Sequence, residues 1–150
     1  MQSETQKRRL SIVRDGKTST CIIRSLNELN SFIKSFAKEL KGGDVLALSG
    51  NLGAGKTTFT QRLAKTLGIL ENVTSPTFVL MKVYCVDKRS VTIKELCHID
   101  AYRLESESDL EAIGAQDYIG RADALTVIEW PERVKEMIPK KAVWITLSTE

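Results

Sequence analysis

The chain has 150 residues, which is long enough for one domain with a sizeable buried core. Its hydrophobic fraction of 42% and charged fraction of 27% are typical of a soluble globular protein, and a net charge of +3 does not by itself indicate nucleic-acid binding. No apolar run approaches the roughly 20 residues that span a bilayer, and the polar N-terminus has no apolar segment of secretory type, so we expect a cytoplasmic protein with no membrane partner.

The first part of the chain predicts a basic tail, a β-hairpin and a helix. The dense basic run Lys7-Arg8-Arg9 is interpreted as a solvated terminus. Two β-rich runs within residues 10–24 flank Asp15-Gly16, a dipeptide suited to a tight hairpin turn. The segment Ser25-Leu26-Asn27-Glu28 has the S-x-x-E spacing of a capping box, and the apolar spacing after it predicts a helix that Gly42-Gly43 ends.

A buried strand, a glycine-rich loop and a second helix follow. Val45-Leu46-Ala47-Leu48 is a continuous apolar run, as expected of a strand that is buried on both faces of a parallel sheet. Residues 50–57 read GNLGAGKT, which has the spacing G-x-x-x-x-G-K-T. Residues 58–67 predict a helix that Gly68 ends.

The second half of the chain predicts further strands between shorter helical segments. Thr74-Ser75-Pro76-Thr77 reads as a rigid polar loop. The remaining predicted elements are strands over residues 78–86, 91–99, 125–128 and 142–147, an acidic and partly helical segment over 104–120, and a short helix over 131–138. This order of strands and helices around a glycine loop predicts an α/β sandwich.

The glycine loop predicts a nucleotide site, because it stands between a strand and a helix. Glycines let the backbone approach phosphates and turn its N–H groups toward them, and the helix that follows adds the positive end of its dipole. Lys56 is placed to reach the β- and γ-phosphates, and the hydroxyl of Thr57 is placed to ligate Mg²⁺.

Two carboxylates are candidates for holding Mg²⁺ or its water. Asp100 ends the predicted strand before the acidic segment, and Glu129 ends the run Leu125-Thr126-Val127-Ile128. Strands of such a sheet deliver residues at their ends into the ligand crevice. Which of the two acids is the direct metal ligand stays open. A metal role is not expected of His98, the only histidine, which we interpret as a strand residue with a satisfied side chain.

The loop permits several classes of protein, and the rest of the sequence narrows them. A GTPase would show N-K-x-D for guanine, which the chain lacks, and the D-x-x-G match at residues 117–120 lies outside the expected context and is taken as coincidence. A small ATPase acting on a partner fits the chain best. A small-molecule kinase and a nucleotide-dependent regulator remain as alternatives, and Thr74 and Thr77 are candidates for contacting the γ-phosphate.

Four motifs in the same order resemble the TsaE (YjeE) family. They are GNLGAGKTTF from Gly50, VTSPTF from Val73, HIDAYRL from His98 and IEWPE from Ile128. Members of this family are small bacterial ATPases that are required to make threonylcarbamoyladenosine in tRNA. The resemblance runs from about Ser25 to Ser148. One departure lies in the glycine loop, where Asn51 stands in place of the family's usual Asp.

The resemblance implies a fold, ligands and partners for the chain. The fold would be a P-loop NTPase-like three-layer sandwich with a central mixed sheet, formed by residues 25–150 behind a tail and hairpin in residues 1–24. The ligands would be ATP and Mg²⁺. The partners would be the TsaB–TsaD complex, which the protein would reset by hydrolysing ATP, and tRNA only indirectly, through that complex.

The resemblance also implies roles for individual residues. Asp100 would lie near the metal and its water, and Glu129 would lie on the metal or the attacking water. Thr77 would belong to a switch-like loop, and Trp130 would lie beside the nucleotide. The start of the first helix, near Glu28, would approach the adenine. The phosphates and the metal would be bound by Leu52, Gly53, Ala54, Gly55, Lys56, Thr57 and Thr58, with Thr57 on Mg²⁺.

Overall fold

A seven-stranded sheet runs through the part of the chain that the computed structural model describes, which is residues 7–76, 79–87 and 92–149. Its strands are β1 (Arg8–Arg14), β2 (Lys17–Ile23), β3 (Val45–Ser49), β4 (Met81–Cys85), β5 (Glu95–Asp100), β6 (Ala124–Glu129) and β7 (Val143–Thr149). The helices are α1 (Leu26–Ala37), α2 (Lys56–Thr66), α3 (Glu107–Ala112) and the 3-10 helices η2 (Ala115–Asp117) and η3 (Pro131–Met137).

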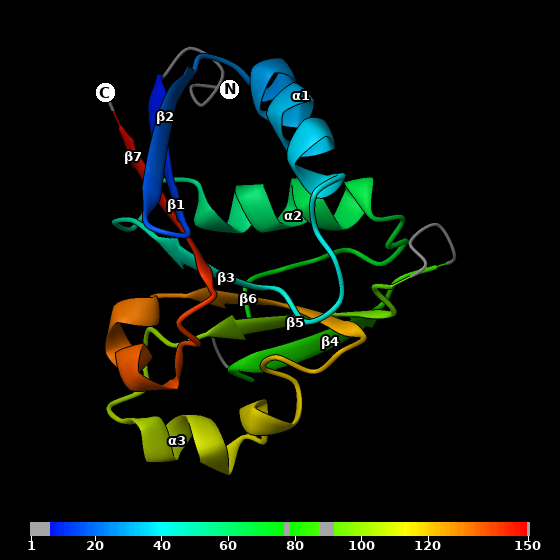
Figure 1. The fold of residues 1–150 in the computed structure, drawn as a ribbon, viewed down its shortest axis with the longest axis vertical. Helices are drawn as coiled ribbons and strands as arrows, with labels where there is room; N and C mark the ends of the chain where they lie inside the picture. The colour runs from blue at the N-terminus through cyan, green and yellow to red at the C-terminus, as the bar shows by residue number, and fades with distance from the viewer. Residues whose placement is uncertain (1–6, 77–78, 88–91, 150) are drawn as a thin grey trace.

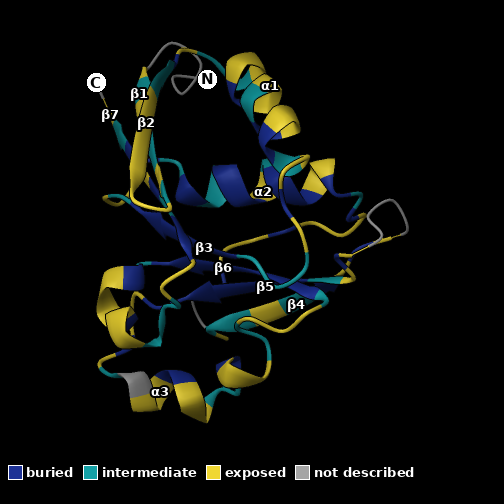
Figure 2. Ribbon diagram, viewed as in Figure 1, coloured by how far each residue is buried: buried dark blue, intermediate teal, exposed yellow. Residues whose placement is uncertain are grey.

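The sheet is mixed, as predicted. Its strand order is β2-β1-β7-β3-β6-β5-β4. The four central strands β7, β3, β6 and β5 run parallel, whereas β1 and β2 on one side and β4 on the other pair antiparallel. The central strands β3 and β6 are buried along their whole length (Figure 2), which explains why both read as continuous apolar runs.

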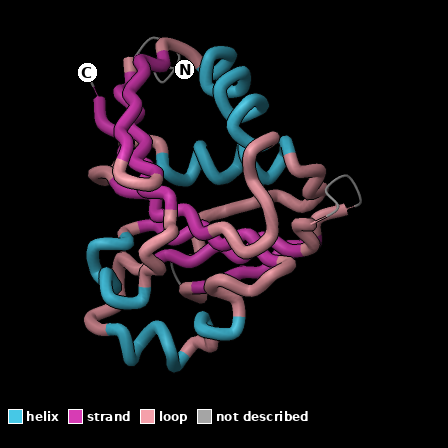
Figure 3. Tube along the Cα trace, in the orientation of Figure 1, coloured by secondary structure: helices cyan, strands magenta, loops and turns pink. Residues whose placement is uncertain are grey.

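Helices cover both faces of the sheet, so the predicted three-layer sandwich is confirmed. Helices α1 and α2 lie on one face, and α3 lies with the two 3-10 helices on the other (Figure 1, Figure 3). Two apolar clusters fill the spaces between the layers. Along β5 the side chains alternate between them, since Leu96 belongs to the cluster under α1 and α2 while Cys97 and Ile99 belong to the other.

The N-terminal hairpin is joined to the central sheet. Asp15 and Gly16 form its turn with φ values of 52° and 76°, the left-handed geometry that a two-residue hairpin turn requires. Strand β1 pairs with β2 on one edge and with β7 on the other, and Leu10 lies opposite Leu147. The division of the chain into residues 1–24 and 25–150 stays a prediction.

Several predicted boundaries shift in the structure. Strand β4 begins only at Met81, because Leu80 has a φ of 70° and its N–H donates to the carbonyl of Pro76 at 2.6 Å, which makes a turn there. Strand β5 begins at Glu95. The predicted first residues of these two strands, Phe78 and Val91, lie outside the described part of the chain. The predicted helix after Pro131 is the 3-10 helix η3, which is kinked at Val134.

The N-cap bond of the predicted capping box forms at Ser25. The Oγ of Ser25 accepts the backbone N–H of Glu28 at 3.2 Å, and the carboxylate of Glu28 accepts the backbone N–H of Arg24 at 2.8 Å. The first bond satisfies a donor that the first turn of α1 would otherwise leave unpaired, whereas the second joins Glu28 to the residue before the N-cap. None of the helices within the described residues combines the length and the apolar character needed to cross a membrane.

Candidate nucleotide-binding site

Strand periodicity turns three polar side chains toward the layer that contains α2. In β5 the apolar residue Leu96 packs under α1 and α2, so His98 and Asp100, two and four residues further on, point to the same face. In β6 the same alternation from Val127 brings Glu129 to that face. The fold therefore gathers the three polar side chains on one side of the sheet.

The register of the parallel strands sets the two carboxylates side by side. Asp100 is the Cα partner of Glu129 across β5 and β6, and Leu48 is the partner of Glu129 across β3 and β6. Strand β3 ends at Ser49, directly before the glycine loop. The carboxyl ends of these strands thus meet at the loop, at the position where open α/β sheets bind their ligands.

The glycine loop needs its glycines for backbone geometry. Gly50, Gly53 and Gly55 have φ values of 148°, 80° and 106°, which side chains rarely allow. A Cβ at Gly50 would lie 2.5 Å from the carbonyl oxygen of Leu147, so there is no room for one. Gly55 is the N-cap of α2, and the first N–H groups of that helix therefore lie at the loop, where they suit an anion.

Lys56 folds back over its own loop. Its Nζ donates to the carbonyls of Gly50 and Asn51, the latter at 3.0 Å, and it lies 4.2 Å from the centroid of the Trp130 ring. The residue is only 5% exposed. Burial lowers the pKa of the Lys56 ammonium, and three nearby carboxylates oppose this shift: Glu129, Glu132 and Asp100. A buried cation thus stands at the loop with backbone carbonyls as its partners.

Glu129 links the loop to the interior of the sheet. Its carboxylate oxygens lie 3.4 and 3.5 Å from the Oγ1 of Thr57, and one of them lies 2.6 Å from the Nε2 of His98. Both members of the His98–Glu129 pair are buried. His98 lies in β5, as the sequence predicts, and its Nε2 has Glu129 as a partner, whereas its buried Nδ1 has no partner among the described residues.

Asp100 is held by the segment that contains the predicted switch loop. The Oγ of Ser75 donates to one of its carboxylate oxygens at 3.2 Å, and the backbone N–H of Tyr102 donates to the other at 3.0 Å. Thr77, the residue predicted for the switch loop, lies outside the described residues.

An aromatic pair borders the site beside Lys56. The ring centroids of Tyr102 and Trp130 are 4.9 Å apart, and the guanidinium of Arg133 lies 5.6 Å from the centroid of Tyr102. Trp130 has a φ of 59°, a left-handed conformation that precedes Pro131 at the start of η3. Its backbone turn directs the indole over the Lys56 ammonium, where a cation–π contact forms.

The glycine loop, the two carboxylates and the aromatic pair line one cleft of about 360 Å³. Of the predicted site residues, Ala54 is buried behind the loop and Glu28 accepts the N–H of Arg24 at the start of α1, and neither lines this cleft. The lining residues are Arg8, Leu52, Gly53, Gly55, Lys56, Thr57, Thr58, Ser75, Asp100, Tyr102, Glu129 and Trp130. The D-x-x-G match lies elsewhere, around η2 on the opposite face of the sheet.

Sequence analysis missed three residues of the lining, of which Ser75 was assigned only to the polar loop before Thr77. Tyr102 stands two residues after Asp100, and its position in the HIDAYRL motif was a usable signal. Arg8 was assigned to a solvated tail, and that interpretation is wrong, because Arg8 is the first residue of β1 and its side chain reaches the cleft. Nothing local in the sequence distinguishes Arg8 from its basic neighbours.

The oxygen donors at the loop fit a magnesium ion bound together with phosphates. The hydroxyl of Thr57 and the carboxylates of Asp100 and Glu129 are the hard ligands that Mg²⁺ prefers. The described residues contain no group of three or more His, Cys, Asp or Glu side chains at metal-binding spacing. A nucleotide-bound Mg²⁺ needs fewer protein ligands than such a group provides, since phosphates and water supply the others.

Comparison with known proteins identifies the family. The profile described as "Threonylcarbamoyl adenosine biosynthesis protein TsaE" matches residues 23–150. The chain belongs to the TsaE family. This finding confirms the resemblance of the four motifs.

Relatives of the chain support the same assignment. A protein of Treponema pallidum named "tRNA threonylcarbamoyladenosine biosynthesis protein TsaE" is 41% identical over 127 residues, which cover 85% of this chain and 89% of that protein. The Bacillus subtilis protein of the same name is 38% identical over 120 residues, covering 80% and 71%. The crystal structure of YdiB from Bacillus subtilis matches with a TM-score of 0.66 and 29% identity over 97% of this chain and 80% of YdiB.

Proposed function

We propose that this member of the TsaE family binds ATP with Mg²⁺ in the cleft and hydrolyses it as a component of tRNA threonylcarbamoyladenosine biosynthesis. The observation that carries the proposal is the convergence of the glycine loop with two strand-end carboxylates. Thr57 lies within 3.5 Å of Glu129, and Asp100 is the register partner of Glu129. This arrangement joins a phosphate cradle to groups that can hold a metal ion and a water molecule.

Binding requires Lys56 to change partners. In the structure its ammonium is bonded to the carbonyls of Gly50 and Asn51. A phosphate oxygen is a stronger, charge-assisted acceptor than a carbonyl, and burial away from water strengthens the attraction further. The ammonium would therefore turn from its own loop to the β- and γ-phosphates while the loop N–H groups bind the other phosphate oxygens.

The carboxylates would act on the water and the metal. Bound Mg²⁺, held by Thr57 with Asp100 or Glu129, would neutralise charge on the phosphates. Glu129 is suited to orient the attacking water, because the contact with His98 fixes its carboxylate. Asp100 is fixed by Ser75 and by the N–H of Tyr102, so a movement of the 74–77 segment would reposition it.

The partner in this proposal is the TsaB–TsaD complex, and tRNA is involved only through it. The mouth of the cleft carries exposed apolar side chains, with Leu52 72% and Tyr102 38% exposed, next to Trp130. A partner that covers them would exclude water and brace the segment around Ser75. Binding of ATP and of the partner would then strengthen each other by the same factor.

The test of this proposal is an ATPase assay of the purified protein, alone and with TsaB and TsaD, combined with multi-round formation of threonylcarbamoyladenosine in tRNA. We expect slow hydrolysis alone and faster hydrolysis with the partners. The variant Glu129→Gln should keep most of its ATP affinity and lose turnover by roughly 10²-fold or more, whereas Lys56→Ala should lose affinity.

Four outcomes would contradict parts of the proposal. Equal affinity for ATP in Lys56→Ala would place the nucleotide elsewhere. Normal hydrolysis in Glu129→Gln would remove that residue from the chemistry. Transfer of labelled γ-phosphate to a small molecule instead of water would identify a kinase. Absence of any effect on multi-round modification would show that the ATPase activity does not serve tRNA threonylcarbamoyladenosine biosynthesis.

A further inference from the structure

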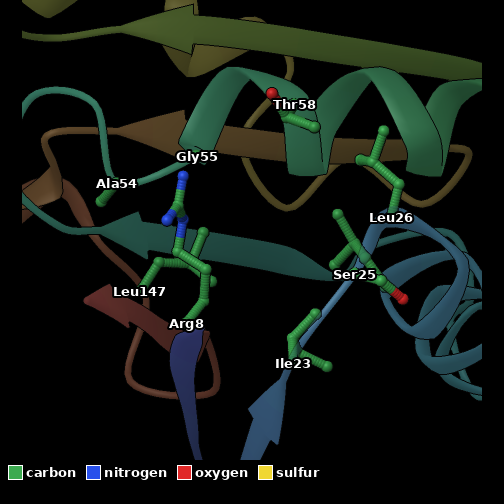
Figure 4. Close-up of a pocket in the computed structure, with 9 residues that line it drawn as sticks. Arg8, Ile23, Ser25, Leu26, Ala54, Gly55, Thr58 and Leu147 are labelled. Carbon is green, nitrogen blue, oxygen red and sulfur yellow. The ribbon is translucent and has the colours of Figure 1, made fainter. Parts of the chain in front are cut away.

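Arg8 connects the N-terminal hairpin to the glycine loop. It is the first residue of β1, and its side chain lies on the same face of the strand as the buried Leu10. In Figure 4 the side chain extends from β1 toward Gly55, with Thr58 on the first turn of α2 beyond it. Arg8 lines the cleft and also a smaller adjoining cavity of about 50 Å³, where it lies with Gly55 and Thr58.

One nitrogen of the Arg8 guanidinium is buried without a partner, in a side chain of intermediate exposure. Its Nη1 is shielded from solvent and has no hydrogen-bond partner among the described residues. Its Nε would lie 3.5 Å from a Cβ at Gly55, so the group lies against the backbone of the loop. An arginine keeps its charge at all ordinary pH values, and a buried charged donor without an acceptor is costly. A ligand that supplies the acceptor would explain this arrangement.

Charge in the cleft is divided between its two ends. Lys56, Thr57 and the two carboxylates are in contact with one another or with Trp130 at one end. None of these four residues lines the smaller cavity, where Arg8 lies with Gly55 and Thr58. The lining of the cleft contains two cations, Arg8 and Lys56, against two carboxylates, so an ATP molecule brings anionic charge that the second cation can balance.

We propose that Arg8 binds the α-phosphate of the nucleotide and that the N-terminal hairpin thereby completes the nucleotide site. The inference rests on the proposed function. Lys56, Thr57 and the carboxylates are the groups that act on the γ-phosphate and its metal, so the phosphate furthest from them is the one next to Gly55 and Thr58. A guanidinium there offers a planar fork of donors, which suits phosphate oxygens better than a lysine does.

The experiment compares Arg8→Met with the matched control Arg9→Met by calorimetric titration with ATP and ADP. Both substitutions remove one positive charge from β1, but Arg9 is exposed and follows Arg8 on the alternate face of the strand. Because the α-phosphate is common to both nucleotides, Arg8→Met should weaken ATP and ADP equally, by about 10-fold or more. Arg9→Met should stay within about twofold of the unmodified chain, as a surface charge change would.

Thermal unfolding without nucleotide separates a binding role from a structural one. Removing a buried donor that lacks an acceptor should leave the Tm of Arg8→Met unchanged or raise it. Arg8→Lys keeps the charge but not the fork, so its affinity should fall between those of Arg8→Met and the unmodified chain.

Each other outcome overturns a specific statement. Equal nucleotide affinity in Arg8→Met and the unmodified chain overturns the role of Arg8 and leaves the proposed function intact. Loss of ATP affinity with unchanged ADP affinity overturns the assignment to the α-phosphate. A lowered Tm of the nucleotide-free Arg8→Met variant assigns Arg8 to the fold instead. An unmodified chain that binds neither nucleotide overturns the proposed function, and the role of Arg8 falls with it.

Discussion

Among single residues, His98 was not predicted as part of the site, yet its side chain contacts the predicted site residue Glu129. Its Nε2 lies 2.6 Å from Glu129, and both side chains are buried, so His98 holds the carboxylate in one orientation. We expect His98→Ala to lower kcat for ATP by about 10-fold with little change in KM, because a loosened Glu129 affects hydrolysis more than binding. Steady-state kinetics measures both constants. His98→Gln, which retains an amide near Glu129, should recover part of kcat, and equal kcat in all three proteins would refute a positioning role.

The cysteines should differ sharply in reactivity. Cys97 is fully buried in β5, and burial, with a smaller contribution from the charge of Glu95, raises the pKa of its thiol to about 12. Because only the thiolate reacts and the solvent pH lies far below that pKa, Cys97 should resist iodoacetamide at about pH 8. Cys85 is exposed and should be alkylated in the folded protein. Peptide mass spectrometry checks this, and modification of Cys97 before unfolding would contradict it.

Among the elements, the junction of β3 with the glycine loop has the tightest backbone packing of the site. Gly50 combines a φ of 148° with a Cβ position only 2.5 Å from the carbonyl oxygen of Leu147 in β7. Gly50→Ala should therefore lower the free energy of unfolding by about 2 kcal/mol or more through strain and overpacking. Urea unfolding followed by circular dichroism measures the change.

The matched control for this junction is Gly53→Ala. Gly53 also has a positive φ, 80°, but no atom lies within 4 Å of its Cβ position. Only the conformational strain applies there, so we expect a loss of about 1 kcal/mol. Equal losses in the two variants would show that the contact with Leu147 is unimportant.

At the scale of the whole molecule, the hairpin and the central sheet share one core. Leu10 and Leu147 are 1% and 3% exposed and lie opposite each other across β1 and β7. Deleting residues 1–24 should lower the Tm by roughly 10 °C or more, because it exposes this core and leaves β7 as an unprotected edge. A thermal melt with size-exclusion chromatography tests this. An unchanged Tm in a monomeric 25–150 fragment would support the predicted division into two parts.

The sequence by itself determined the elements that depend on local patterns. The hairpin turn at Asp15-Gly16, the N-cap bond of Ser25 and the strand–loop–helix order around GNLGAGKT are all present in the structure. Each depends on residues within a few positions of one another, so local propensity decides it. The strand-end positions of Asp100 and Glu129 were also predictable, since apolar runs mark where buried strands end.

Only the tertiary structure decided which distant residues meet at the loop. The register of β5 against β6 sets Asp100 beside Glu129. The pairing of β1 with β7 brings Arg8 to the loop beside Gly55, far from it in the sequence. The sequence context of Arg8 is that of a solvated basic tail. Strand pairing is set by side chains on several strands at once, and no single segment contains that information. For this reason the sequence predicted the phosphate loop, while the second cation and the His98–Glu129 pair became visible only once the sheet was assembled.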